Sequence, residues 1–189
     1  QVFFNGFELD TIPGTLEELL YFSFDGPEGQ NLPDTLIDEA SAIVFTREGS
    51  AVYASGYTNT GARFSSADAG YYCADPGIRD TLDLIIPEYG IEFWMYPEAV
   101  EQSVIIRKYL SWYIDIRDDG RVYWNHGGLG DHDGLSSSPG SIKAGQWYDV
   151  KAVFDSNDLT EPMKLYLDGV KVDAGGASAG SGSGLGATC

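Results

Sequence analysis

Short runs of alternating apolar and polar residues, separated by aspartate–glycine pairs, are the feature of this sequence that most restricts its fold. The pair Asp168-Gly169, for example, lies between two alternating runs at residues 163–167 and 170–172. An Asp-Gly pair between two β-rich runs is a strong signal for a β-hairpin. The strands expected on this basis are residues 19–24, 91–96, 104–107, 111–117, 121–124, 146–154, 163–167 and 170–172.

Helical signals are weak by comparison. The best helical segment, residues 14–20, is too short to be stable alone. Strands do not alternate with helices along the chain, so a parallel nucleotide-binding sheet is not expected. The sequence predicts an all-β protein, an antiparallel two-sheet jelly-roll sandwich.

The charge of the chain excludes several classes of partner. Its 189 residues, enough for one domain with a sizeable core, carry 29 acidic and 11 basic side chains, a net charge of −18. Such a chain repels the phosphates of nucleic acids and anionic lipid surfaces. The sequence contains no apolar stretch long enough for a transmembrane helix, so membrane insertion is not expected. Cations, above all Ca²⁺, are the natural counterparts of surplus carboxylates.

The first residue and the cysteines suggest export. The chain begins at Gln1, so we expect that a secretory leader has been removed and that the protein is extracellular or at the cell surface; a trimmed chain is the alternative. In an exported protein, Cys73 and Cys189 suggest one disulfide, within or between chains, with two unpaired thiols as the alternative.

Four stretches, taken together in this order, resemble one family. Residues 19–26, LLYFSFDG, resemble the first strand of laminin-G-like domains of the concanavalin A-like jelly roll, and residues 91–97, IEFWMYP, resemble its central strand. Residues 142–150 and 164–170 are similar to its late strands. The resemblance extends from residue 19 to about residue 172 and implies the jelly-roll fold. Lectins, glycan-cleaving enzymes and adhesion modules share that fold, so it does not define the function.

The sequence departs from the family at its final strand. Nothing after residue 172 resembles the family's closing strand, whereas residues 4–10, FNGFELD, do. Either the domain is circularly permuted and this segment pairs inside its own chain, or the segment completes the sheet of a neighbouring molecule; an ordinary N-terminal strand is the third reading. Strand addition repeated head to tail would build a fibre. The predicted assembly strand consists of Phe3, Phe4, Asn5, Gly6, Phe7, Glu8, Leu9 and Asp10.

Composition and resemblance divide the chain into three parts. Residues 1–18 form an N-terminal strand segment, the possible donor strand, and residues 19–173 form the jelly-roll domain. Residues 174–189 form a tail rich in Gly, Ser and Ala that ends in Cys189.

The sequence has no pattern typical of catalysis, and the chain is not expected to be an enzyme. Glycoside hydrolysis needs two carboxylates on one face, and the Glu-x-Asp-x-x-Glu string of the family's hydrolases is missing. Tyr113, Asp115 and Arg117 alternate on one face, but any half-exposed strand has this pattern. His126 and His132 lie in a Gly-rich stretch whose side chains suit Zn²⁺ or Cu²⁺, but their spacing matches no known metal site.

The resemblance also implies a cation site near the first and last strands. Asp25 and Asp10, with Glu8 nearby, occupy the matching positions and are the candidate Ca²⁺ ligands; the loop at residues 155–158 offers further oxygen donors. Tyr and Trp rings stack on the apolar faces of sugars. The glycan-contact candidates are Tyr57, Trp112 and Trp124, with Tyr53 and Tyr123 also considered and core packing as the alternative role for each.

Two functions from different classes fit these observations. The first is a secreted, non-catalytic structural subunit that self-assembles into an extracellular filament or surface layer by terminal strand exchange, so that its main partner is itself. The alternative is a calcium-assisted carbohydrate-binding or adhesion module of a larger secreted protein, whose partner is a polysaccharide.

Overall fold

The structure, a computed structural model, describes residues 2–10, 18–40, 42–64, 70–73, 88–108, 112–126 and 134–175. These residues form strands and turns without a helix, so the all-β prediction is confirmed, and they include no helix that could cross a membrane. The strands are β1 (Val2–Asp10), β2 (Glu18–Phe22), β3 (Thr35–Ile37), β4 (Val44–Glu48), β5 (Ala51–Ser55), β6 (Thr60–Phe64), β7 (Gly70–Cys73), β8 (Glu88–Pro97), β9 (Ser103–Lys108), β10 (Trp112–Ile116), β11 (Val122–His126), β12 (Gly134–Ser136), β13 (Tyr148–Asp155), β14 (Met163–Leu167) and β15 (Val170–Gly175).

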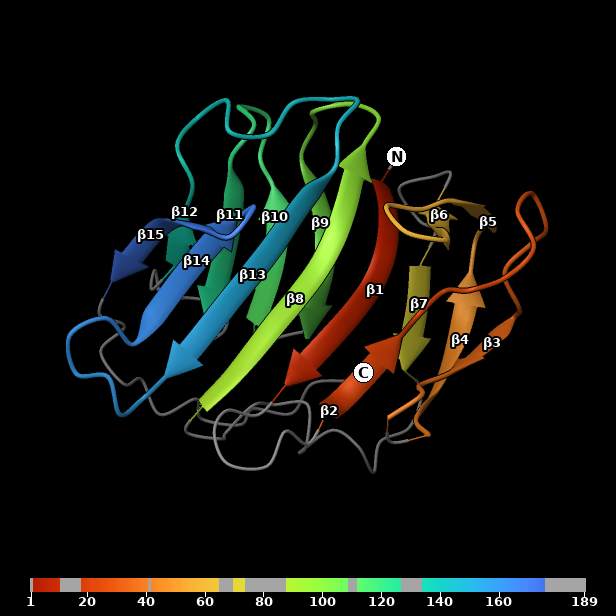
Figure 1. The fold of residues 1–189 in the computed structure, drawn as a ribbon, viewed down its shortest axis with the longest axis horizontal. Coiled ribbons are helices and arrows are strands. Elements are labelled where there is room, and N and C mark those ends of the chain that lie inside the picture. Colours follow the sequence, from red (N-terminus) through yellow and green to blue (C-terminus); the bar gives the residue numbers. More distant parts are fainter. Residues whose placement is uncertain are drawn as a thin grey trace.

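The strands build two layers (Figure 1). One layer is an eight-stranded antiparallel sheet in the order β15-β14-β13-β8-β1-β6-β5, with β2 paired to β1. Behind β13 and β8 lies a four-stranded sheet, β12-β11-β10-β9, and a three-stranded sheet, β3-β4-β7, lies at the right of the view. Leu36 and Phe45 of the three-stranded sheet pack against the same core as the other two sheets. The arrangement is the predicted jelly-roll sandwich.

The N-terminal strand β1 lies inside the large sheet of its own chain. It pairs with β8 along nearly its whole length. On its other side its first residues pair with β6 and its last residues with β2. The structure of this single chain therefore shows the intramolecular pairing, and exchange of β1 between chains stays a prediction. The three-part division of the chain also stays a prediction, although β1 and the jelly-roll strands share one sheet.

The core lies between the two layers because alternate residues of each strand point inward. In β13 the burial alternates strictly, with Tyr148, Val150, Ala152 and Phe154 buried. Each large apolar side chain removed from water contributes about 1.5–3 kcal/mol to folding. The largest fully buried side chain is Trp124 of β11. The period of two in the sequence thus sets which residues hold the layers together.

The predicted Asp-Gly hairpin between β14 and β15 is confirmed. Asp168 and Gly169 have φ angles of 50° and 73°, and positive φ at both central residues is typical of the type I′ turn. The Asp168 carboxylate also accepts a hydrogen bond of 2.9 Å from the backbone N–H of Asp149. The turn is therefore tied to the neighbouring strand β13.

Candidate functional site

The outward face of the four-stranded sheet carries the most organised group of polar and aromatic side chains. In β10, Trp112, Ile114 and Ile116 belong to the core, so the residues that alternate with them lie on the opposite face. The register places residues of β9, β11 and β12 beside them. We name this group the tyrosine–arginine face: Arg107, Tyr113, Asp115, Arg117, Tyr123 and Asn125.

Arg117 connects the aromatic and the acidic parts of this face. Its guanidinium carbon lies 4.4 Å from the centroid of the Tyr123 ring, within the range of a cation–π contact. Its Nε atom lies 2.9 Å from Oδ1 of Asp115. The Tyr123 and Tyr113 rings are neighbours, with centroids 5.7 Å apart. Two rings and a guanidinium plane thus form one partly exposed surface.

Asp115 lies beneath this surface and is almost completely buried, with 3% of the residue exposed. Burial disfavours the charged carboxylate and raises the pKa of Asp115 to about 6, although the Arg117 charge acts in the opposite direction. Burial, followed by the nearby Tyr123 ring, raises the pKa of Tyr113 as well. The Tyr113 phenol therefore stays protonated at neutral pH and can donate and accept hydrogen bonds.

Asn125 and Gly134 fix the position of Tyr123. Asn125 is also buried on this face, with 3% exposed, and its amide donates a long hydrogen bond of 3.4 Å to the Tyr123 hydroxyl. A Cβ atom at Gly134 would lie 2.2 Å from that hydroxyl and 2.4 Å from the ring carbon that bears it. Only glycine leaves room for the ring, so the sequence of β12 determines where Tyr123 lies.

The structure corrects two of the three predicted glycan-contact residues. Trp112 and Trp124 are 3% and 0% exposed and pack in the core, because they occupy the inward positions of β10 and β11. A glycan cannot reach them. Tyr57, by contrast, is 52% exposed, and its ring lies flat on Trp94 with centroids 3.7 Å apart.

The Gly-rich stretch that contains His126 and His132, expected as a loop over residues 125–134, begins instead inside a strand. Asn125 and His126 belong to β11. His126 stacks on Phe154, with ring centroids 4.2 Å apart, and its Nδ1 atom lies 2.6 Å from the Tyr89 hydroxyl. His126 therefore faces the core, and His132 lies outside the described residues.

The predicted calcium ligands are not brought together along the backbone. Asp10 is opposite Glu18 in the register of β1 and β2, whereas Asp25 follows the other end of β2, where Phe22 is opposite Phe7. The side chains of Glu8 and Asp10 lie outside the described ones, and the described residues contain no group of three His, Cys, Asp or Glu that could hold a metal ion. Calcium binding stays a prediction.

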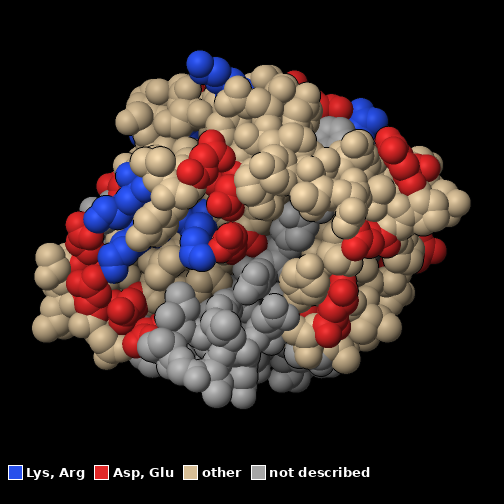
Figure 2. Space-filling model, in the orientation of Figure 1, with Lys and Arg blue, Asp and Glu red and all other residues tan. Residues whose placement is uncertain are grey.

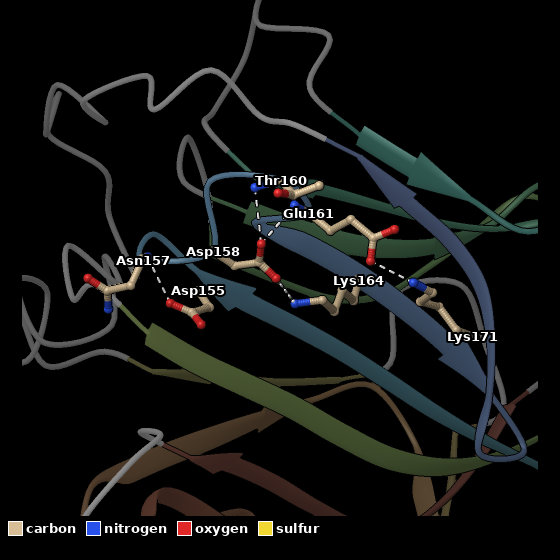
Figure 3. Close-up of polar contacts among 7 residues, drawn as sticks. All are labelled: Asp155, Asn157, Asp158, Thr160, Glu161, Lys164 and Lys171. Carbon is tan, nitrogen blue, oxygen red and sulfur yellow. Dashed lines mark hydrogen bonds and ion pairs between the residues drawn. The ribbon is translucent and has the colours of Figure 1, made fainter.

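The acidic loop between β13 and β14 is organised by its own hydrogen bonds (Figure 3). The Asp158 carboxylate accepts 3.0 Å bonds from the backbone N–H groups of Thr160 and Glu161 and lies 2.6 Å from Lys164 Nζ. The Lys164 bond and those backbone bonds lower the pKa of Asp158 to about 2. Asp155 accepts a bond from the backbone of Asn157. These contacts give the loop a structural role.

The predicted disulfide of Cys73 and Cys189 falls largely outside the residues that the structure describes. The backbone of Cys73, the last residue of β7, pairs with that of Phe45. Its side chain and the whole of Cys189 lie outside the described residues, so the disulfide stays a prediction.

The two-layer antiparallel sandwich, with its core between the layers and an organised polar face on one of them, defines a jelly-roll domain of the concanavalin A-like type. In a comparison with known families, residues 79–187 match Laminin_G_3, described as the concanavalin A-like lectin/glucanases superfamily. The match spans more than half of the chain, which belongs to this family. No curated protein and no solved structure matches the chain.

From the sequence, Tyr113, Asp115 and Arg117 were recognised as alternating residues and assigned a structural role. Asn125 and Gly134 were not recognised as parts of this face. One available signal was that these three residues alternate with purely apolar ones, which points them away from the core. The requirement for glycine at residue 134 could not be read from the sequence, because it depends on a ring of another strand.

Proposed function

We propose that this chain is an extracellular, non-catalytic carbohydrate-binding module that holds a glycan on the tyrosine–arginine face. The observation that carries the proposal is the packing of Tyr113, Tyr123 and Arg117 into one outward surface above the buried Asp115 and Asn125. A sugar has apolar ring faces that stack on aromatic rings, and hydroxyl groups that pair with polar side chains. This surface offers both kinds of contact.

The buried groups hold the exposed ones in place. Asp115 fixes Arg117 through the 2.9 Å ion pair, and Asn125 contacts the Tyr123 hydroxyl. Groups that are already ordered lose less conformational entropy when a ligand binds. We therefore assign contact with the sugar to the tyrosines and Arg117, and positioning to Asp115 and Asn125.

The charges of the chain favour neutral glycans over polyanions. Arg117 is paired with Asp115, and the next basic residue, Arg121, is paired with Asp119 at 2.8 Å. The net charge of −18 further repels an anionic polymer over about one Debye length. A neutral polysaccharide meets neither obstacle. Calcium assistance stays part of the proposal, and chelation tests it.

We propose that the tyrosine–arginine face binds a glycan without cleaving it, because the described part of this face offers a single carboxylate and glycosidases use two. Among the described strand positions that share this face, Asp115 is the only Asp or Glu. Glycosidases place two carboxyl groups about 5–10 Å apart. Asp115 is also engaged by Arg117.

The alternative of a filament subunit receives no support from the structure or from the comparisons. Its central element, β1, is paired on both sides within its own chain. The family assignment fits a lectin-like or a structural module equally, and laminin-G-like domains are typically extracellular.

Two-dimensional NMR of the isotope-labelled chain tests the proposal, with soluble neutral β-glucan, xylan and mannan oligosaccharides added with Ca²⁺ or with chelator. We expect at least one oligosaccharide to shift the amide signals of β10 and β11. Tyr113→Ala should weaken this binding about tenfold, the effect of one lost aromatic contact.

Tyr166→Ala is the matched control, because Tyr166 is a half-buried tyrosine on the other sheet. This variant should leave the β10 and β11 response unchanged. Absence of any shift on these strands with all three glycans, or an equal response of Tyr113→Ala and the unaltered chain, would refute the assignment.

A further inference from the structure

A second aromatic surface lies on the opposite side of the molecule. The large sheet buries Phe93 and Met95 of β8, so Trp94 and Tyr96 point away from the core. Trp147, just before β13, and Tyr57, in the turn between β5 and β6, join them. We name Tyr57, Trp94, Tyr96 and Trp147 the aromatic platform.

The platform is a continuous set of ring contacts. Tyr57 and Trp94 are nearly parallel, with centroids 3.7 Å apart and an interplanar angle of 8°. Trp147 lies 6.1 Å from Tyr57 and 5.5 Å from Tyr96. Tyr57 stacks on Trp94 with one ring face and is itself 52% exposed, so part of its side chain is accessible to a ligand.

Polar groups border the platform. Asp149 is opposite Trp94 in the register of β13 and β8 and shares its outward face. Burial, followed by the charge of Glu92, raises the pKa of Asp149, with Lys151 acting in the opposite direction. Its Oδ1 atom is buried and has no hydrogen-bond donor among the described residues. The residue as a whole is only half-buried, so a ligand hydroxyl that donates to the accessible part of this carboxylate would offset part of the cost of burying its charge.

The nearby cations are engaged by acids. Lys151 Nζ lies 2.5 Å from Glu92, and Arg63, on β6, lies 3.0 Å from Glu98. Figure 2 shows acidic and basic groups side by side on this face, with a wide uncharged area beside them. These ion pairs leave the chain with a net charge of −18. The carboxylates of this face therefore disfavour an anionic ligand.

We propose that the aromatic platform is a second glycan-binding site for a neutral sugar chain. One sugar ring stacks on Tyr57, and a sugar hydroxyl donates a hydrogen bond to the Asp149 carboxylate. The proposal rests on observations independent of the tyrosine–arginine face. If both sites bind, the domain carries them on opposite faces of the sandwich (Figure 1) and cross-links long polysaccharides; this consequence alone depends on the proposed function.

Tryptophan fluorescence separates the two sites. The chain has four tryptophans, of which Trp112 and Trp124 are buried in the core, and Trp94 and Trp147 belong to the platform. The tyrosine–arginine face contains none. Neutral β-glucan, xylan and mannan oligosaccharides are titrated against the full chain while the tryptophan emission is recorded.

We expect one of these glycans to change the emission with saturation, and Tyr57→Ala to weaken this response about tenfold. Tyr57 is exposed in a turn, so this substitution leaves the core intact. Asp149→Asn, which keeps the shape but not the charge, should also weaken it, whereas Tyr113→Ala on the opposite face should leave it unchanged.

Three results would overturn the proposal. They are an emission that no glycan changes, an equal response from Tyr57→Ala and the unaltered chain, and self-association in ultracentrifugation that Tyr57→Ala abolishes while glycans have no effect. The last result would mean that a second copy of the chain covers the platform. If no glycan binds the tyrosine–arginine face, these three results keep their meaning. Binding at that face is measured by the NMR signals of β10 and β11 and by Tyr113→Ala, whereas the platform is tested by tryptophan emission and by Tyr57→Ala.

Discussion

The guanidinium group of Arg117 lies over the ring of Tyr123, 4.4 Å from its centroid. The hairpin between β10 and β11 holds the two residues in this position, because the Arg117 N–H donates a 2.8 Å hydrogen bond to the carbonyl of Arg121. The contact joins an exposed aromatic surface to a buried carboxylate. Changes of charge or volume beneath the surface should therefore alter what the surface binds.

Gly134→Ala should disturb the tyrosine–arginine face while leaving the fold intact. The new methyl group would lie 2.2 Å from the Tyr123 hydroxyl, so the ring must move from the position in which it contacts Arg117. We expect glycan binding at this face to weaken about tenfold with little change in melting temperature, measured by NMR titration and calorimetry. The double variant Gly134→Ala, Tyr123→Ala should bind no more weakly than Tyr123→Ala alone, since both act on one ring; additive losses would contradict this explanation.

Asp115 should make the stability of the protein depend on pH between about 4 and 7. Its pKa of about 6 in the folded state lies above the usual value of 3.8, so the folded state holds the proton more tightly than the unfolded state. The free energy of unfolding that Asp115 contributes is therefore present in full below pH 4 and is lost as the pH rises through 6.

Asp115→Asn removes this titration. Melting temperatures measured for both proteins from pH 4 to pH 8 should show the unaltered chain losing stability relative to the variant as the pH rises to about 6, and a constant difference above about pH 7. Parallel curves across the whole range would show that Asp115 does not carry a raised pKa.

Asp158 should act in the opposite sense. Its pKa is lowered to about 2 by the Lys164 bond and by the N–H groups of Glu161 and Thr160, so its contribution to stability is present above about pH 4 and is lost as the pH falls towards 2. Asp158→Asn should lower the melting temperature at pH 7 and have no effect near pH 2. Glu101→Gln, at an exposed residue, is the control and should change little at either pH.

Ile114→Ala should test the core directly beneath the tyrosine–arginine face. Ile114 is 0% exposed, and removal of such a side chain lowers the free energy of unfolding by about 2–5 kcal/mol. Val104→Ala on the adjacent strand β9 is the control, because Val104 is 51% exposed and its truncation leaves no cavity. Denaturant titration measures both, and equal losses would show that Ile114 is not part of a packed core.

The strands themselves could be predicted because their signals are local. The alternation in residues 146–154 and the Asp168-Gly169 pair depend on side-chain direction and turn geometry within a few residues, and both features are present in the structure. The family resemblance was likewise carried by whole strands, and the match at residues 79–187 confirms it.

The sites were harder to predict because they depend on contacts between distant residues. The aromatic platform joins Tyr57 to Trp94 and Trp147, residues from three separate parts of the chain, and no local pattern connects them. The sequence left the partner of residues 4–10 open for the same reason, since strand pairing is set by the whole sheet. Trp112 and Trp124 were proposed for glycan contact on residue type alone, whereas their inward positions decide their role.

The central place of β1 also has a consequence for how the chain reaches its folded state. Strand β1 precedes β8, at residues 88–97, by a long segment of the chain and pairs with it, so this whole segment must be synthesised before the large sheet can close. Until then β1, which contains Phe3, Phe4 and Phe7, has only its shorter pairings with β2 and β6 available. Pairings this distant in sequence slow folding and prolong the exposure of apolar segments. Biogenesis of this domain should therefore depend on a holding chaperone more strongly than its native stability alone would suggest.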